Sequence, residues 1–142
     1  QLPRPMMYSQ DYDFSFSGLK TAVLYKVKKL KTINYKLKTA FCAEIQQAII
    51  DVLIYKTLKV AKDFKVRAII LGGGVAANEE LRRQFQLTIS NQQLAMNFLV
   101  PAKNFCTDNA TMVAIAGYFN RQNKKNWKKI KANANLKIGQ KI

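Results

Sequence analysis

The sequence predicts an α/β fold, and two short apolar stretches carry that prediction. Residues 66–71 are almost unbroken apolar and β-branched, which is typical of a strand buried on both faces in a parallel sheet. Residues 96–100 form a second apolar stretch, which Pro101 ends. Segments with helical periodicity precede, separate and follow the two stretches. This alternation favours a strand–helix–strand unit, because parallel strands need a long crossover between them.

Four helices are expected, over residues 18–31, 39–62, 78–90 and 110–122. Ser17 is a plausible N-cap for the first helix. The middle of the second helix is apolar nearly all round, which predicts that it is buried.

Some side chains and segments carry narrower expectations. Asp51 lies within the apolar run of the second helix and needs a partner, for which Lys56 and Arg67 are the candidates. In the third helix the expected inward positions are Leu81, Phe85 and Leu87. Residues 103–109 are expected to be a polar loop, and two strands alone would leave unpaired edges for strands from elsewhere to complete.

The charge of the chain favours a polyanionic partner. It has 24 Lys and Arg against 8 Asp and Glu, a formal net charge of +16. Asp108 is the last acidic residue, and a basic tail at about residues 120–142 follows it. Within this tail Lys124, Lys125, Lys128 and Lys129 are candidate RNA phosphate contacts. Solvated surface lysines are an equally weighted interpretation.

Other features of the composition exclude some functions. The chain has no histidine, so it cannot by itself form a Ser-His-Asp or Cys-His catalytic site or a histidine-based metal site. Its two cysteines are far apart and fit a reducing, cytoplasmic location better than a disulfide framework. No window of 18 apolar residues predicts a membrane span. The first residues resemble neither a signal peptide nor a protein's own N-terminus with its initiator methionine, so we expect a longer protein.

Three glycines between the first strand and the third helix are the candidate nucleotide site. Gly72, Gly73 and Gly74 would let a ligand approach the backbone, and Asn78 follows them at the start of the helix. A tight structural turn and a helix N-cap are the alternatives. A dinucleotide-binding fingerprint would need an acidic residue after the second strand; Pro101-Ala-Lys-Asn follows instead, so a dehydrogenase is disfavoured. Glu79 and Glu80 would repel a phosphate, so we expect the glycines to face adenosine.

Three separate stretches together resemble the TsaD family, formerly called Gcp or O-sialoglycoprotein endopeptidase. They are Asp13-Phe-Ser-Phe-Ser-Gly-Leu-Lys-Thr21, Gly72-Gly-Gly-Val-Ala-Ala-Asn-Glu-Glu-Leu-Arg82 and Cys106-Thr-Asp-Asn-Ala-Thr-Met-Val-Ala114. The resemblance implies that residues 1–142 are the C-terminal half of an actin-like (ASKHA) ATPase domain, whose sheet is incomplete without the N-terminal half. It implies transfer of threonylcarbamoyl from threonylcarbamoyl-AMP to N6 of adenosine 37 in tRNAs that read ANN codons.

The resemblance also implies ligands and partners. The glycines and Asn78 would contact ATP or threonylcarbamoyl-AMP. Asp108 would bind one Fe(II) or Zn(II) together with two histidines of a His-x-x-x-His motif in the N-terminal half. Partners would be tRNA, that N-terminal half, the paralogous TsaB subunit and the ATPase TsaE, with no membrane involved.

Two other interpretations of the residues stay open beside the resemblance to the TsaD family. Asp108 by itself is also a plausible helix N-cap. The chain lacks the His-x-x-x-His motif, so we expect it to be inactive alone and assign it no catalytic residue. A non-catalytic, basic RNA-binding module is the alternative function, whereas a metalloprotease is disfavoured because there is no His-Glu-x-x-His helix.

Overall fold

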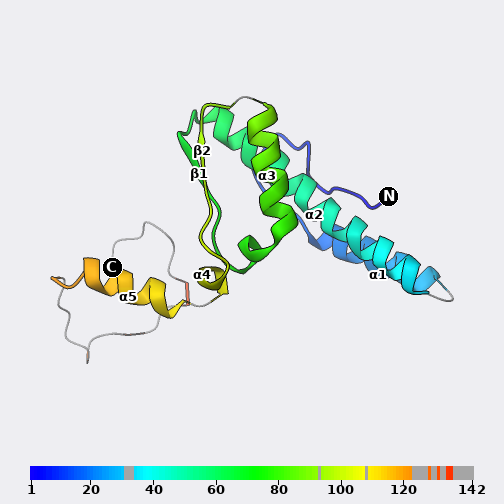
Figure 1. Ribbon diagram of the computed structural model, residues 1–142. Helices are drawn as coiled ribbons and strands as arrows, with labels where there is room; N and C mark the ends of the chain where they lie inside the picture. Colours follow the sequence, from blue (N-terminus) through cyan, green and yellow to red (C-terminus); the bar gives the residue numbers. More distant parts are fainter. Residues whose placement is uncertain are drawn as a thin grey trace. The chain divides into compact units, whose positions relative to one another are not determined.

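The computed structural model describes residues 1–30, 34–92, 94–107, 109–122, 128, 131 and 134–135. The chain divides into two compact units, Gln1–Thr107 and Asp108–Ile142. In order along the first unit are α1 (Ser17–Lys29), α2 (Tyr35–Asp63), β1 (Ala68–Ile70), the 3-10 helix η1 (Gly74–Ala77), α3 (Glu79–Asn91), β2 (Asn97–Leu99) and α4 (Asn104–Thr107) (Figure 1). The second unit contains α5 (Ala110–Phe119).

The two strands form a small parallel sheet, as the sequence predicts, and α3 connects them. Ile69 lies opposite Phe98 in the register, and the pairing continues past β1 because Leu71 N donates to Leu99 O at 3.0 Å. The expectation that residues 66–71 are buried on both faces is wrong. Ile69 is buried, but the neighbouring Ile70 is 75% exposed. The helices of this unit cover only one face, and successive strand residues point to opposite faces.

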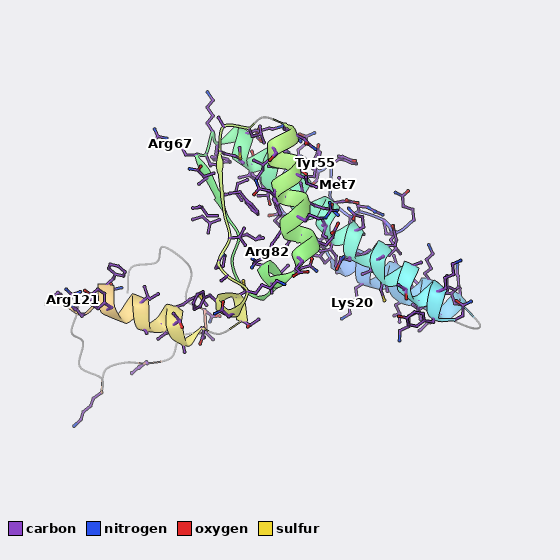
Figure 2. All side chains as sticks on the ribbon, in the orientation of Figure 1. Met7, Lys20, Tyr55, Arg67, Arg82 and Arg121 are labelled. Carbon is purple, nitrogen blue, oxygen red and sulfur yellow. The ribbon has the colours of Figure 1, made fainter. Side chains whose placement is uncertain are left out.

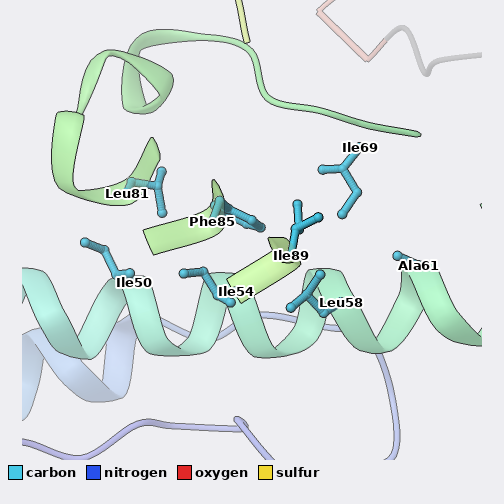
Figure 3. Packing of buried hydrophobic residues seen from close by; sticks show 8 residues of the cluster. All are labelled: Ile50, Ile54, Leu58, Ala61, Ile69, Leu81, Phe85 and Ile89. Atoms are coloured by element: carbon cyan, nitrogen blue, oxygen red, sulfur yellow. The ribbon is translucent and has the colours of Figure 1, made fainter. Parts of the chain in front are cut away.

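The core lies between that face of the sheet and two helices (Figure 3). α2 contributes side chains about one helical turn apart, so they share one face of the helix. The cluster consists of Ile50, Ile54, Leu58 and Ala61 from α2, Ile69 from β1, and Leu81, Phe85 and Ile89 from α3. Phe85 stacks on Phe98 of β2 with ring centroids 5.4 Å apart. Leu81 and Phe85 are inward as expected. Leu87 is exposed and Ile89 is buried instead, because two residues along a helix turn the side chain by about 200°.

α1 and the first half of α2 form an antiparallel hairpin. A second cluster holds them together, in which Leu19 of α1 and Ala48 of α2 are buried with Leu2. α2 begins earlier than expected, because the Asn34 side chain accepts a hydrogen bond from Leu37 N at 2.8 Å and caps the helix. The assignment of Ser17 as an N-cap is wrong. Ser17 is already helical, and its hydroxyl lies 3.2 Å from that of Ser15.

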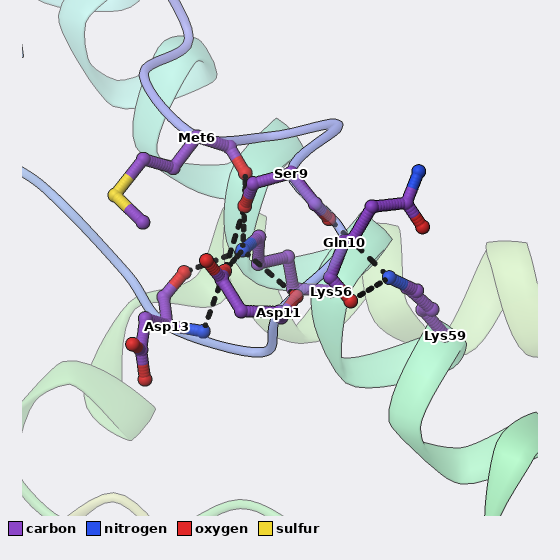
Figure 4. A network of polar contacts seen from close by, with 7 residues as sticks. All are labelled: Met6, Ser9, Gln10, Asp11, Asp13, Lys56 and Lys59. Atoms are coloured by element: carbon purple, nitrogen blue, oxygen red, sulfur yellow. Dashed lines mark hydrogen bonds and ion pairs between the residues drawn. The ribbon is translucent and has the colours of Figure 1, made fainter.

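Residues 1–13 are tied to α2 by ion pairs that the sequence did not reveal. Asp51 pairs with Arg4, not with Lys56 or Arg67: Arg4 Nε donates to Asp51 Oδ2 at 2.9 Å. Arg4 also pairs with Glu44 at 2.6 Å. Lys56 instead binds the segment around Asp11 (Figure 4). These partners are 40 to 47 residues apart in sequence, so local spacing could not have identified them.

The last expectations fall after β2. The prediction of a polar loop over residues 103–109 is wrong in part, since α4 forms one helical turn there. α5 ends at Phe119 rather than near residue 122, with Asn120 as its C-cap. Among the helices that the structure describes, none is both long and apolar enough to span a membrane.

Candidate functional site

The glycine turn connects the end of β1 to the start of α3. Gly73 has φ 78° and ψ 178°, a region of backbone conformation that is essentially reserved for glycine. Two hydrogen bonds then close the turn, from Ala76 N to Gly73 O at 3.0 Å and from Asn78 N to Val75 O at 3.1 Å. Gly73 is therefore required by the backbone itself, whatever the turn binds.

Gly72 and Gly74 differ from Gly73, because their backbone angles suit any residue. A Cβ added at either position would meet no atom of the described chain within 4 Å, and all three glycines are exposed. Packing within the described residues therefore does not require glycine at these two positions. Open space over an exposed backbone is the arrangement that a ligand held close to the main chain needs.

Asn78 is the N-cap of α3, as the sequence predicts. Its Oδ1 accepts from Leu81 N at 2.9 Å, and its Nδ2 donates to Gln46 Oε1 of α2 at 3.1 Å. A groove of about 380 Å³ lies beside this pair. Its lining is mostly apolar and includes Cys42, Ile45, Gln46, Ile49, Val75 and Asn78. The volume is within the range of small-molecule sites, and the two amides give an apolar groove a polar rim.

The carboxylates at the start of α3 are paired with cations. Glu79 forms an ion pair with Lys103, which follows β2. Glu80 pairs with Arg83 at 2.5 Å, and the hydrogen bonds from Arg83 and then Gln84 lower the pKa of Glu80 to about 2. These partners reduce the repulsion that the two acids would exert on an anionic ligand at the turn.

Arg82 joins two of the motif stretches that the sequence places apart (Figure 2). Its Nε donates to Ala76 O of η1, and its Nη2 donates to Cys106 Sγ of α4 at 3.0 Å. Cys106 is buried, as is typical of a cysteine that packs as a small apolar side chain. Sequence reasoning missed Arg82 because nothing local shows that α4 packs against η1. The only local signal was its position one helical turn after the capping Asn78.

The remaining predicted site residues are mostly outside the described part of the chain. Asp108, Lys124, Lys125 and Lys129 all fall there, and Lys128 is described and exposed. In the described residues no three His, Cys, Asp or Glu side chains lie together as a metal would require. The described residues therefore do not form a complete transition-metal site, and the sequence contains no histidine that could contribute to one.

Comparisons with known proteins identify the family. The family model described as TsaD, tRNA N6-adenosine threonylcarbamoyltransferase, matches residues 1–115, which include the glycine turn and Asp108 but not the basic tail. A relative of that name from Thermosipho africanus is 51% identical over 116 residues, which are 82% of this chain and 34% of the relative. Similar proteins from Thermosipho melanesiensis and Desulfotalea psychrophila are 52% and 43% identical, over 34% and 35% of their lengths. The chain spans about a third of the length of these relatives, and it belongs to the TsaD family.

Proposed function

We propose that this chain is part of a tRNA N6-adenosine threonylcarbamoyltransferase. In the proposed reaction N6 of adenosine 37 attacks the carbamoyl carbon of threonylcarbamoyl-AMP. A C–N bond forms, the C–O bond to the phosphate breaks, AMP leaves and the N6 proton passes to solvent. Because the adenylate is already activated, no protein nucleophile is needed. Membership of the family supports the reaction, and the exposed glycine turn beside an apolar groove is the observation of this chain that carries the proposal.

In this proposal the glycine turn and the neighbouring groove hold the adenosine part of ATP or threonylcarbamoyl-AMP. Gly72, Gly73 and Gly74 present the backbone, and the apolar walls beside Asn78 and Gln46 suit the faces of a base. The two amides sit at the rim, where they can exchange their mutual hydrogen bond for bonds to the edge of the base.

The two strands would belong to a larger sheet of an actin-like domain, completed by the N-terminal half of the enzyme. Among the described residues β1 and β2 pair only with each other, which leaves edges for further strands, and the exposed face at Ile70 leaves room for a covering layer. That half would also supply the two histidines that, with Asp108, bind Fe(II) or Zn(II). A bound metal of this kind supplies Lewis acidity. The proposed partners are tRNA, TsaB and TsaE, and the free cysteines Cys42 and Cys106 fit the expected cytoplasmic location.

The glycine turn permits a sharp test of nucleotide binding. Gly73→Val confounds loss of ligand with backbone strain, whereas Gly74→Val places a side chain in open space at an unstrained position. We expect Gly74→Val to keep the thermal stability of the chain, and to weaken ATP or threonylcarbamoyl-AMP binding at least tenfold in a protein restored to full length. Isothermal titration calorimetry measures the affinities, and Leu87→Ile is the control, at an exposed residue of α3 that does not line the groove. Equal affinities in all three proteins would reduce the glycines to a structural turn.

The proposed role of Asp108 as a metal ligand is tested in the same protein restored to full length. Asp108→Asn keeps most N-capping ability but removes the ligand charge, so metal occupancy should fall if Asp108 is a ligand and should be unchanged if it is only a cap. Metal analysis of the purified proteins measures the occupancy. The 142-residue chain alone is expected to hold substoichiometric iron or zinc and to modify no tRNA.

A basic RNA-binding module without chemistry remains the second candidate function, because of the net charge of +16. It predicts tRNA binding that is lost when Lys124, Lys125, Lys128 and Lys129 are neutralised, with no nucleotide binding at the glycine turn. A chain that binds tRNA but not the adenylate, even when restored to full length, would favour this function over the transferase.

A further inference from the structure

Most of α1 and the start of α2 lie in a stretch of the chain that carries positive charge only. Residues 14–43 contain seven lysines and no acidic residue. Of these lysines, Lys31 lies outside the described residues and the other six are exposed: Lys20, Lys26, Lys28, Lys29, Lys36 and Lys38. Lys20 belongs to the first turn of α1 (Figure 2), whereas the other five lie in the last turn of α1 and the first turn of α2.

Antiparallel packing brings those two helix ends together. Leu19 packs with Ala48, and Val23 and Phe41 join the same cluster, so the end of α1 lies beside the start of α2. Lys26 Nζ lies 6.0 Å from the centre of the Phe41 ring, which places a lysine of α1 over α2 at this end. Figure 1 shows this end of the hairpin extending away from the two strands. We call the five lysines at residues 26, 28, 29, 36 and 38 the basic end.

The lysines of the basic end are not neutralised by acidic side chains of the described chain. Among the described residues, none of its lysines takes part in an ion pair. Five of the seven acids of the first unit are engaged in ion pairs elsewhere: Glu44 and Asp51 with Arg4, Asp11 with Lys56, Glu79 with Lys103, and Glu80 with Arg83. A sixth, Asp63, accepts a hydrogen bond from the Tyr12 hydroxyl. The hairpin therefore presents an uncompensated positive charge to solvent.

Helix stability accounts for only part of the basic end. Lys26, Lys28 and Lys29 lie at the C-terminal end of α1, where the helix dipole favours cations. Lys36 and Lys38 lie at the opposite kind of end, the start of α2, which has no acidic residue in its first turn. Cations there oppose the dipole, so a requirement other than the stability of α2 has to explain them.

We propose that the basic end binds the phosphates of RNA. Its only exposed aromatic neighbours are two tyrosines of the described hairpin, Tyr25 and Tyr35, whose exposed fractions are 60% and 85%. Tyrosine rings beside lysines can stack on unpaired bases while the lysines contact the backbone. That the RNA is a tRNA rests on the proposed function, whereas the binding of phosphates does not.

The arrangement favours RNA over a membrane surface. Helical spacing of about 100° per residue spreads Lys26, Lys28 and Lys29 around α1. A helix that lies on a lipid surface instead separates its cations from one continuous apolar face. A polyanion can wrap around a helix end, and so can reach lysines that do not share a face.

The test compares two triple variants that remove the same charge from the 142-residue chain. One removes part of the basic end (Lys28→Gln, Lys29→Gln, Lys38→Gln), and the control acts at the opposite end of α2 and beyond it (Lys62→Gln, Lys65→Gln, Arg67→Gln), at residues that are also exposed. Binding of an unmodified tRNA transcript is followed by fluorescence anisotropy over a series of salt concentrations. We expect the first variant to bind roughly tenfold to a hundredfold more weakly at 0.1 M salt, with the slope of log affinity against log salt reduced by about 2 to 3. The control should change both values much less.

Lys36→Glu keeps the test independent of folding defects. This change should raise the thermal midpoint, because it places an acid at the start of α2, and should lower tRNA affinity at the same time. Equal losses in the two triple variants, or unchanged affinity in Lys36→Glu, would overturn the proposal. So would hairpin-dependent binding to phosphatidylserine vesicles together with hairpin-independent binding to tRNA. A restored enzyme without transferase activity, but with hairpin-dependent tRNA binding, would refute the proposed function and leave this inference standing.

Discussion

Lys56 is the most unusual single residue of the described chain, because its charged side chain is fully buried. Its Nζ donates to Ser9 Oγ at 2.7 Å, to Asp11 Oδ1 at 2.9 Å and to Asp13 O at 2.5 Å (Figure 4). A buried ammonium is tolerated when its three donors and its charge are all satisfied, as they are here. Lys56 thereby fixes residues 9–13 on α2, directly ahead of the first motif stretch.

Removing this ammonium should destabilise the fold. Lys56→Met keeps the length of the side chain but leaves the carbonyl of Asp13 and the hydroxyl of Ser9 without their donor, so we expect a loss of about 1–3 kcal/mol in the free energy of unfolding. Urea denaturation measures it. Lys59→Met is the matched control, because Lys59 donates hydrogen bonds to main-chain carbonyls of the same segment and lies over the Tyr12 ring, from a less buried position. Equal losses would show that burial of Lys56 is unimportant.

Asp11 gives the stability of the chain a pH dependence. The hydrogen bond from Lys56, and then the one from Ser9, lowers the pKa of Asp11 from 3.8 to about 2. A carboxyl whose pKa is lower in the folded state stabilises the fold above its unfolded pKa, and this contribution disappears as the pH falls towards 2. Wild type and Asp11→Asn should therefore differ in thermal midpoint at pH 6 and converge near pH 2. Glu80 has a similarly lowered pKa, so the difference between the two proteins, and not the wild-type curve alone, is the quantity to follow.

At the scale of the elements, Arg82 connects η1 to α4. One guanidinium serves two acceptors from different elements, Ala76 O and Cys106 Sγ. The fixed fork of arginine can do this, whereas a lysine has a single charged nitrogen. Arg82 thereby holds Cys106, which lies two positions before Asp108 in the sequence.

Replacing this connection should loosen α4 while leaving α3 folded. We expect Arg82→Lys to destabilise the chain by about 1–3 kcal/mol, because one acceptor loses its donor. Hydrogen exchange should become faster at the amides of Phe105 and Cys106, which bond to Ala102 O and Lys103 O. Arg83→Lys, one residue along on an exposed side chain, is the control. Unchanged exchange in α4 would show that its packing does not depend on Arg82.

At the scale of the whole molecule, the sheet presents an uncovered face. Among the described residues β1 and β2 pair only with each other, and Ile70 and Leu99 are 75% and 52% exposed. Exposed apolar side chains on neighbouring strands mark a surface that another part of the protein covers. This is the surface on which the proposed N-terminal half would continue the domain.

Two neighbouring isoleucines separate folding from association. Ile69→Ala should cost about 2–5 kcal/mol in the chain alone, because it leaves a cavity in the core. Ile70→Ala should leave the stability of the chain nearly unchanged, since its side chain is exposed, but should weaken association with a separately expressed N-terminal half. Chemical denaturation and analytical ultracentrifugation measure the two effects. Unchanged association in Ile70→Ala would mean that this face is not the contact surface.

The sequence by itself determined the two strands, the four longer helices and the family. Local rules sufficed for the strand–glycine–helix order and for the capping of α3 by Asn78, because a helix start and a glycine turn depend on residues a few positions apart. The three motif stretches identified the family, which the comparisons confirmed. Tertiary structure alone decided the partners of the charged side chains: Asp51 with Arg4, Lys56 with Asp11, and Arg82 with Cys106. Those pairs are separated by 24 to 47 residues, so only the packing of α2, α3 and α4 brings them together. The same holds for Ile69 and Ile70, which are adjacent and equally apolar, yet only the arrangement of helices around the sheet decides which of them is buried.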